Sequence, residues 1–150
     1  MVNVLELKQV SKYFSNKEGR KIVFENISFS LAAGEMLSLQ GVSGSGKTTL
    51  LNIIAGFNKP SFGAVKTNTN RLAYAFQDDR LLSTISAYEN LRFVLSKEIS
   101  EDKTNSRIEK WLSNFQLLEA RNQSPEKLSG GMKRRLNLAR SFIMAQSFCY

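Results

Sequence analysis

The chain has 150 residues, of which 42% are hydrophobic and 23% charged, a composition that indicates one folded domain and excludes an extended disordered chain. No apolar run approaches the roughly 18 residues of a membrane-spanning helix, and the N-terminus lacks an export signal. The sequence has one cysteine, Cys149, and no histidine, which excludes an internal disulfide and a Cys/His metal site. Because nothing suggests export, we expect a cytoplasmic protein. The net charge of +8 is spread from Lys8 to Arg140 without the interleaved aromatics of a nucleic-acid groove, so we expect no nucleic-acid partner.

Apolar and polar residues alternate in two stretches near the N-terminus. Leu5 and Leu7 have polar neighbours, and so do Ile27, Phe29 and Leu31. Alternation with a period of two is typical of a strand with one solvated face, so these stretches predict an antiparallel β patch.

A strand, a loop and a helix are expected next. Met36–Gln40 is short and mostly apolar, which predicts a buried strand, and the leucines and isoleucines of Lys47–Ala55 have helical spacing. After the turn-rich stretch Asn58–Gly63, the sequence RLAYAF predicts a second buried strand over Arg71–Phe76.

The pattern becomes helical between Ser86 and Leu118. One face carries apolar residues at i, i+3, i+4 and i+7, so Trp111 among them is expected in the core; the four are Ile108, Trp111, Leu112 and Phe115. The stretch NQSPEKLSGG interrupts this period, and a last helix follows with Met132, Leu136, Ala139 and Ile143 on one face.

The loop between the strand and the helix matches a phosphate-binding pattern. The P-loop, Gly41 to Thr48, has the form G-x-x-x-x-G-K-[ST] and lies between a predicted strand and a predicted helix, as that pattern requires. Its glycines let successive N–H groups converge on phosphate oxygens at the positive end of a helix. The alternative is an ordinary glycine turn followed by an exposed lysine.

The P-loop pattern assigns a role to each polar side chain. Lys47 would contact the β and γ phosphates of ATP, the Thr48 hydroxyl would bind Mg²⁺, and Thr49 would reach the α phosphate. The expected phosphate-binding residues are Gly41, Ser43, Gly44, Ser45, Gly46, Lys47, Thr48 and Thr49.

A second motif narrows the family. The signature segment, Leu128 to Arg140 with the sequence LSGGMKRRLNLAR, resembles the LSGGQ signature of the ATP-binding cassette (ABC) transporter ATPases, with Met132 in place of glutamine. In that family the motif completes the ATP site of the opposite subunit, so the resemblance implies a dimer in which Ser129, Gly130 and Gly131 contact the partner's ATP. The alternative is a helix N-terminus with a flexible Gly-Gly entry.

The resemblance extends to two further positions. Phe14, in preference to Tyr13, stands where the family places an aromatic residue that stacks on adenine; an ordinary strand aromatic is the alternative. Gln77 matches the family's glutamine that contacts Mg²⁺ and the attacking water; a solvated glutamine is the alternative. The resemblance therefore implies that Lys47 and Gln77 are catalytic residues. It also implies that Thr48 and Gln77 are Mg²⁺ ligands. The basic cluster, Lys133 to Arg135, is interpreted as a solvated helix face.

The resemblance implies an α/β fold: a P-loop NTPase-like sheet with an N-terminal antiparallel β patch and a helical subdomain. It implies one ABC-type ATP-binding domain over residues 1–150, with the helical subdomain at about 78–125. The family continues with an aspartate-bearing strand, a glutamate and a switch histidine, whereas this sequence has no carboxylate after Glu126 and no histidine. We therefore expect a C-terminally truncated domain with negligible ATP hydrolysis.

The function that follows is that of an energy-coupling subunit. It would bind ATP and Mg²⁺, pair with a second ATP-binding subunit and a membrane-spanning permease, and lie on the inner face of the cell membrane. The sequence AFQDDRLLSTISAYENL resembles importers of nitrate, sulfonates or taurine, which favours a small anion as the solute. The alternatives are a hydrolysis-deficient nucleotide-binding remnant and a P-loop phosphotransferase kinase.

Overall fold

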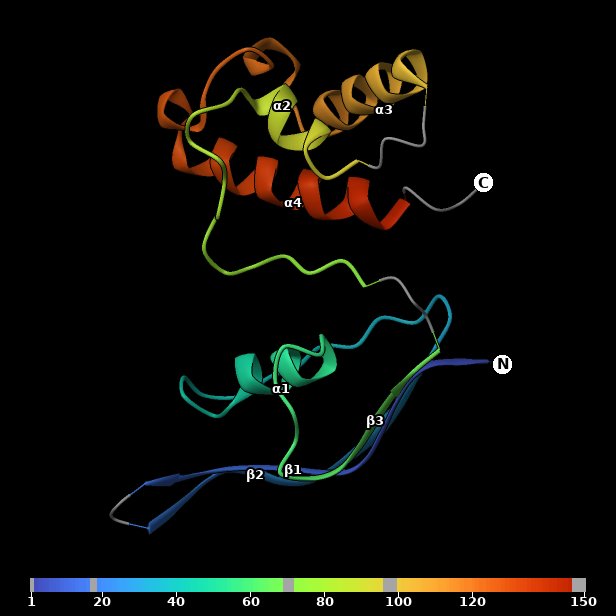
Figure 1. Ribbon diagram of the computed structural model, residues 1–150, viewed down its shortest axis with the longest axis vertical. Coiled ribbons are helices and arrows are strands. Elements are labelled where there is room, and N and C mark those ends of the chain that lie inside the picture. The colour runs from blue at the N-terminus through green and yellow to red at the C-terminus, as the bar shows by residue number, and fades with distance from the viewer. Residues whose placement is uncertain (1, 17–18, 69–71, 96–99, 147–150) are drawn as a thin grey trace. The chain divides into compact units, whose positions relative to one another are not determined.

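The computed structural model describes residues 2–16, 19–68, 72–95 and 100–146 (Figure 1). The chain divides into two compact units, unit 1 over Met1–Leu72 and unit 2 over Ala73–Tyr150. Each unit has its own buried cluster of apolar side chains, and each is described by itself.

Unit 1 contains a three-stranded antiparallel sheet. Its strands are β1 (Asn3–Asn16), β2 (Gly19–Ala32) and β3 (Phe62–Thr67), in the order β2-β1-β3. The predicted antiparallel patch is therefore confirmed as the pair β1 and β2. β1 buries Leu7 and Val10 on the inner face, with an irregularity in the register between these two residues.

Helix α1 (Lys47–Ile54) covers one face of this sheet (Figure 1). Leu50 and Ile53 lie one turn apart, so they share a helix face, and they pack against Leu7 and Val10 of β1. This packing confirms the predicted helix and fixes the position of its N-terminus above the sheet.

Two predicted strands are wrong. Met36–Gln40 has no strand structure, and Met36 is 98% exposed; residues 72–76 have none either, while Arg71 lies outside the described residues. A buried strand exists only where neighbouring strands accept its backbone hydrogen bonds, and the described sheet consists of β1, β2 and β3 alone. Apolar composition could not reveal whether such neighbours are present.

The sheet contains one strand, β3, that the sequence did not predict. It was missed because β3 begins inside the expected turn region. Gly63 of β3 has a φ of +82°, and a Cβ built there would lie 2.3 Å from the carbonyl oxygen of Gln9. Gln9 itself has a φ of +49° in an irregular part of β1. This glycine lets β3 approach the irregularity in β1, so it belongs to a strand and not to a turn.

Unit 2 is helical. Its elements are α2 (Ala87–Arg92), α3 (Glu101–Asn114), the 3-10 turns η1 (Leu118–Ala120) and η2 (Pro125–Lys127), and α4 (Gly130–Gln146). The predicted face of α4 is confirmed, since three of its residues are fully buried and Met132 is half-buried against them; the three are Leu136, Ala139 and Ile143. α2 and α3 pack against α4 (Figure 1).

Trp111 lies at the edge of this core and not at its centre. It is half-buried and stacks on Phe115 and on Phe142, with ring centroids 5.7 Å and 5.9 Å away. Within the part of the chain that the structure describes, no helix is long and apolar enough to cross a membrane.

Candidate nucleotide-binding site

The P-loop has the backbone conformation that its glycines predict. Gly41, Gly44 and Gly46 have φ angles of +153°, +79° and +89°, in the region that disfavours residues with a Cβ. Gly46 caps α1 in the left-handed conformation, and a Cβ on it would lie 2.6 Å from Cγ1 of Val23 in β2. The loop therefore turns tightly against β2 and leads directly into α1.

Backbone donors of the loop are available to a ligand. The Ser45 N–H donates to the Val42 carbonyl at 3.3 Å, and the Leu50 N–H donates to the Gly46 carbonyl at 2.9 Å. Among the described residues, the N–H groups from Gly46 to Thr49 have no acceptor. These are the unpaired donors of a helix N-terminus, and the positive end of the helix dipole adds to their attraction for anions.

Lys47 lies over its own loop. Its ammonium donates to the carbonyl oxygens of Gly41 and Val42, each at 2.8 Å, and lies 3.4 Å from Oγ of Ser45. No acidic residue occupies the first turn of α1, so the region has a positive charge. Thr48 is exposed beside Lys47. Its hydroxyl oxygen can be a ligand of Mg²⁺, which binds oxygen atoms such as those of phosphate and water.

Phe14 and Tyr13 differ in how their rings are covered. The guanidinium of Arg20 lies 3.2 Å from the centroid of the Tyr13 ring, whereas the Phe14 side chain is 52% exposed. The Lys12 ammonium lies 5.1 Å from the Phe14 ring centroid, within the distance of a cation–π contact. Phe14 is thus the more accessible of the two aromatics.

The signature segment begins with a capped helix. The Ser129 hydroxyl accepts a hydrogen bond from the Met132 N–H at 3.3 Å, and the Ser129 carbonyl accepts one from the Lys133 N–H at 2.9 Å. A serine before the first turn is a favoured helix cap, and the exposed Gly130 and Gly131 leave the backbone of that turn open to solvent. Sequence and structure therefore agree on where α4 starts.

The basic cluster is not a solvated face throughout, which corrects the interpretation from sequence. One Arg134 nitrogen, Nη1, donates to the carbonyl oxygens of Gln77 at 2.8 Å and of Phe76 at 3.1 Å. Nε of Arg135 donates to the Phe115 carbonyl at 3.0 Å. The Lys133 side chain alone makes no hydrogen bond to a described residue.

Sequence reasoning also missed Asn137 as a polar residue in the middle of an apolar helix. Asn137 is 1% exposed, and its Nδ2 donates to the Phe76 carbonyl at 3.1 Å. Arg140, one turn further along α4, approaches the Asp79 carbonyl at 3.5 Å, and burial lowers the pKa of its guanidinium. The sequence LNLA places Asn137 between apolar residues of the helix. An asparagine buried there requires a hydrogen-bond partner, so the sequence contained a signal for this contact.

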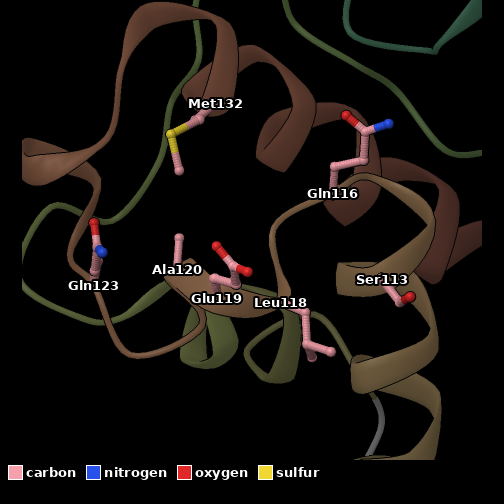
Figure 2. Close-up of a pocket in the computed structure, with 7 residues that line it drawn as sticks. All are labelled: Ser113, Gln116, Leu118, Glu119, Ala120, Gln123 and Met132. Carbon is pink, nitrogen blue, oxygen red and sulfur yellow. The ribbon is translucent and has the colours of Figure 1, made fainter.

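An open pocket of about 500 Å³ lies beside the start of α4 (Figure 2). It is bounded by the end of α3, by η1 and the residues after it, and by the first turn of α4; the lining residues are Ser113, Gln116, Leu118, Glu119, Ala120, Gln123 and Met132. No P-loop residue lines this pocket, so it is not the expected phosphate site.

The expected site residues fall into two groups. Phe14 and the P-loop belong to unit 1, while Gln77 and the signature segment belong to unit 2. Within unit 2 the structure connects Gln77 to α4 through Arg134. Among the described residues no group of three or more Asp, Glu, Cys or His side chains is placed to hold a metal ion.

Comparison with known proteins identifies the family. Residues 24–149 match the family model described as ABC transporter, so the chain belongs to the ABC transporter family. It is similar to the dimeric ATP-binding cassette MJ0796 bound to ADP and Pi, with a TM-score of 0.81 and 28% identity, over 93% of this chain and 69% of that chain. This likeness confirms the expected fold class for the part of the cassette that the chain covers.

Curated relatives include importer subunits. The nitrate transport protein NasD of Klebsiella oxytoca is 32% identical over 96% of this chain and 59% of its own length. The taurine import ATP-binding protein TauB of Pseudomonas aeruginosa is 34% identical over 96% of this chain and 58% of its own length. The spermidine/putrescine import protein PotA of Thermotoga maritima is 34% identical over 91% of this chain and 39% of its own length. The chain thus spans less than two thirds of the length of each of these three curated relatives.

Proposed function

We propose that this protein is the ATP-binding, energy-coupling subunit of an ABC transporter for a small solute. The observation that carries the proposal is the P-loop, in which three glycines with positive φ lead into α1 and the N–H groups from Gly46 to Thr49 have no acceptor among the described residues. A triphosphate supplies the anionic oxygens that such donors bind.

Each P-loop side chain has a role in this proposal. Lys47 exchanges its contacts with the Gly41 and Val42 carbonyls for the β and γ phosphates. Thr48 holds Mg²⁺ through its hydroxyl, and Thr49 contacts the α phosphate. Mg²⁺, when bound, neutralises phosphate charge and orients the phosphate oxygens. Phe14 stacks on adenine, since its ring is more accessible than that of Tyr13.

We further propose that the signature segment contacts ATP held by a second ATP-binding subunit. Ser129, Gly130 and Gly131 open α4 with a capped but solvent-accessible first turn, which suits an anionic ligand. The similar cassette MJ0796 is dimeric in its solved structures, which supports pairing. Gln77 would act beside Mg²⁺ and water, and a permease would be the membrane partner on the inner face of the membrane.

The proposed solute is a small anion. NasD is named for nitrate transport, TauB for taurine import, and the similar SsuB of Bacillus cereus for aliphatic sulfonates import. PotA, at comparable identity, is named for import of polyamines, so the anion assignment is supported by NasD and SsuB, whose named solutes are anions.

A calorimetric titration with ATP and Mg²⁺ tests the proposal. We expect Lys47→Ala to weaken ATP binding about 10- to 150-fold, because one charge-assisted contact contributes about 1.5–3 kcal/mol. Lys59→Ala is the matched control, since Lys59 is an exposed lysine of the same unit outside the P-loop. Equal affinity of the wild type and Lys47→Ala would refute the P-loop assignment.

A further inference from the structure

One face of α4 holds an irregular segment by its backbone. The Gln77 segment, residues 74–79, has no helix or strand, yet four side chains of α4 approach its carbonyl oxygens. Arg134 donates to the carbonyls of Phe76 and Gln77, and Asn137 donates to that of Phe76. The Ser141 hydroxyl, which also lies 3.1 Å from the Asn137 carbonyl oxygen, lies 3.4 Å from that of Tyr74, and Arg140 lies 3.5 Å from that of Asp79.

The spacing of these side chains places them on one stripe of the helix. Arg134, Asn137 and Ser141 stand at i, i+3 and i+7, so they project along the same side of α4. The opposite side carries the buried apolar residues Leu136, Ala139 and Ile143, which anchor the helix in the core of unit 2. A helix fixed in this way can position a segment that lies outside the helices and strands.

Arg134 makes the strongest of these contacts. Its guanidinium is charged and donates from one nitrogen to two adjacent carbonyl oxygens, at 2.8 Å and 3.1 Å. Charge-assisted hydrogen bonds are roughly twice as strong as neutral ones. The Phe76 ring also has two contacts. Its centroid lies 4.8 Å from that of the Tyr74 ring in an edge-to-face arrangement, and the Arg80 guanidinium lies 3.9 Å from the Phe76 centroid.

We propose that Arg134, supported by Asn137, is the positioning residue that fixes the backbone at Gln77 and ties it to the signature helix. Arg134 lies about one turn from the exposed start of α4. Arg134 therefore links the first turns of α4 to the carbonyl of Gln77. This assignment rests on the proposed function, in which Gln77 and the signature segment both serve ATP.

Backbone amide relaxation by NMR on the full chain without nucleotide tests the assignment. In the wild type we expect the Gln77 and Asp78 amides to have order parameters near about 0.85, as in rigid backbone. In Arg134→Ala they should fall below about 0.6, the range of flexible backbone. Arg134→Lys should restore most of the order, because the ammonium keeps the charge and several donors on one nitrogen.

Lys133→Ala is the matched control, since it removes a neighbouring positive charge that makes no hydrogen bond to a described residue. Unchanged order parameters in Arg134→Ala, or an equal loss in Lys133→Ala, would overturn the assignment. So would changed Trp111 resonances in Arg134→Ala, because Arg134 would then be holding the helix core and not the Gln77 segment. No nucleotide is present, so these results are independent of the Lys47 titration.

Discussion

Gly46 must satisfy two requirements at once. Its φ of +89° is strained for any residue with a Cβ, and that atom would also meet Val23 at 2.6 Å and Phe24 at 3.0 Å. Gly44 has a similar φ of +79° but open space around the missing side chain. The two glycines therefore separate the cost of backbone strain from the cost of overpacking.

We predict that Gly46→Ala destabilises unit 1 more than Gly44→Ala does. The left-handed conformation costs an alanine about 1–2 kcal/mol, which applies to both variants. Overpacking against β2 adds about 1–3 kcal/mol in Gly46→Ala alone. Urea unfolding followed by far-UV circular dichroism measures the difference, and equal losses in the two variants would contradict the close packing at Gly46.

The residue types of the P-loop could be read from the sequence, because the glycine spacing has few uses other than phosphate binding. What could not be read is the contact of Gly46 with Val23, since it joins residues far apart in the chain. The hydrogen bonds of Arg134 were missed for the same reason: its partner carbonyls lie more than fifty residues earlier.

At the scale of elements, α2 is a short helix with a complete capping box. The Glu89 N–H donates to Oγ of Ser86 at 3.2 Å, and the Ser86 N–H donates to the Glu89 carboxylate at 2.8 Å. The hydrogen bond from the Ser86 backbone is the main cause that lowers the pKa of Glu89 below its ordinary value of 4.5. The ionised carboxylate therefore stabilises the start of α2.

We predict a pH-dependent contribution from this cap. Because the pKa of Glu89 is lower in the folded state, its stabilisation is present above pH 4.5 and is lost as the pH falls through the folded value. Wild type should melt at a higher temperature than Glu89→Gln at pH 7, and the difference should disappear at low pH. Glu126→Gln is the control, as Glu126 is exposed; a pH-independent difference for Glu89→Gln would contradict the prediction.

Elements whose signal lies within their own sequence were predictable. α1, α3 and α4 carry an apolar face at helical spacing, and apolar and polar residues alternate around Leu5 and Leu7 in β1 and over residues 27–31 in β2. Met36–Gln40 was predicted wrongly because a buried strand depends on neighbours elsewhere in the chain. β3 was missed because its glycine and polar flanks resemble a turn until the approach of Gly63 to Gln9 is known.

At the scale of the whole molecule, the ATP-related residues are divided between two units with separate cores. Unit 1 carries the P-loop and Phe14, and unit 2 carries Gln77 and the signature segment. Sequence motifs could predict both groups of residues, but they contain no information on how the groups are arranged.

The most direct test of the central claim, that the P-loop binds ATP, is hydrogen exchange with and without ATP and Mg²⁺. Among the described residues the N–H groups from Gly46 to Thr49 have no acceptor, so they should exchange rapidly in the free protein. At an ATP concentration about ten times the wild-type Kd, we predict that ATP slows exchange about tenfold in peptides covering residues 41–49, and that Lys47→Ala, which binds about 10- to 150-fold more weakly, reduces this protection to about twofold or less. Bound ATP that leaves residues 41–49 unprotected, or that protects them equally in Lys47→Ala, would contradict the account.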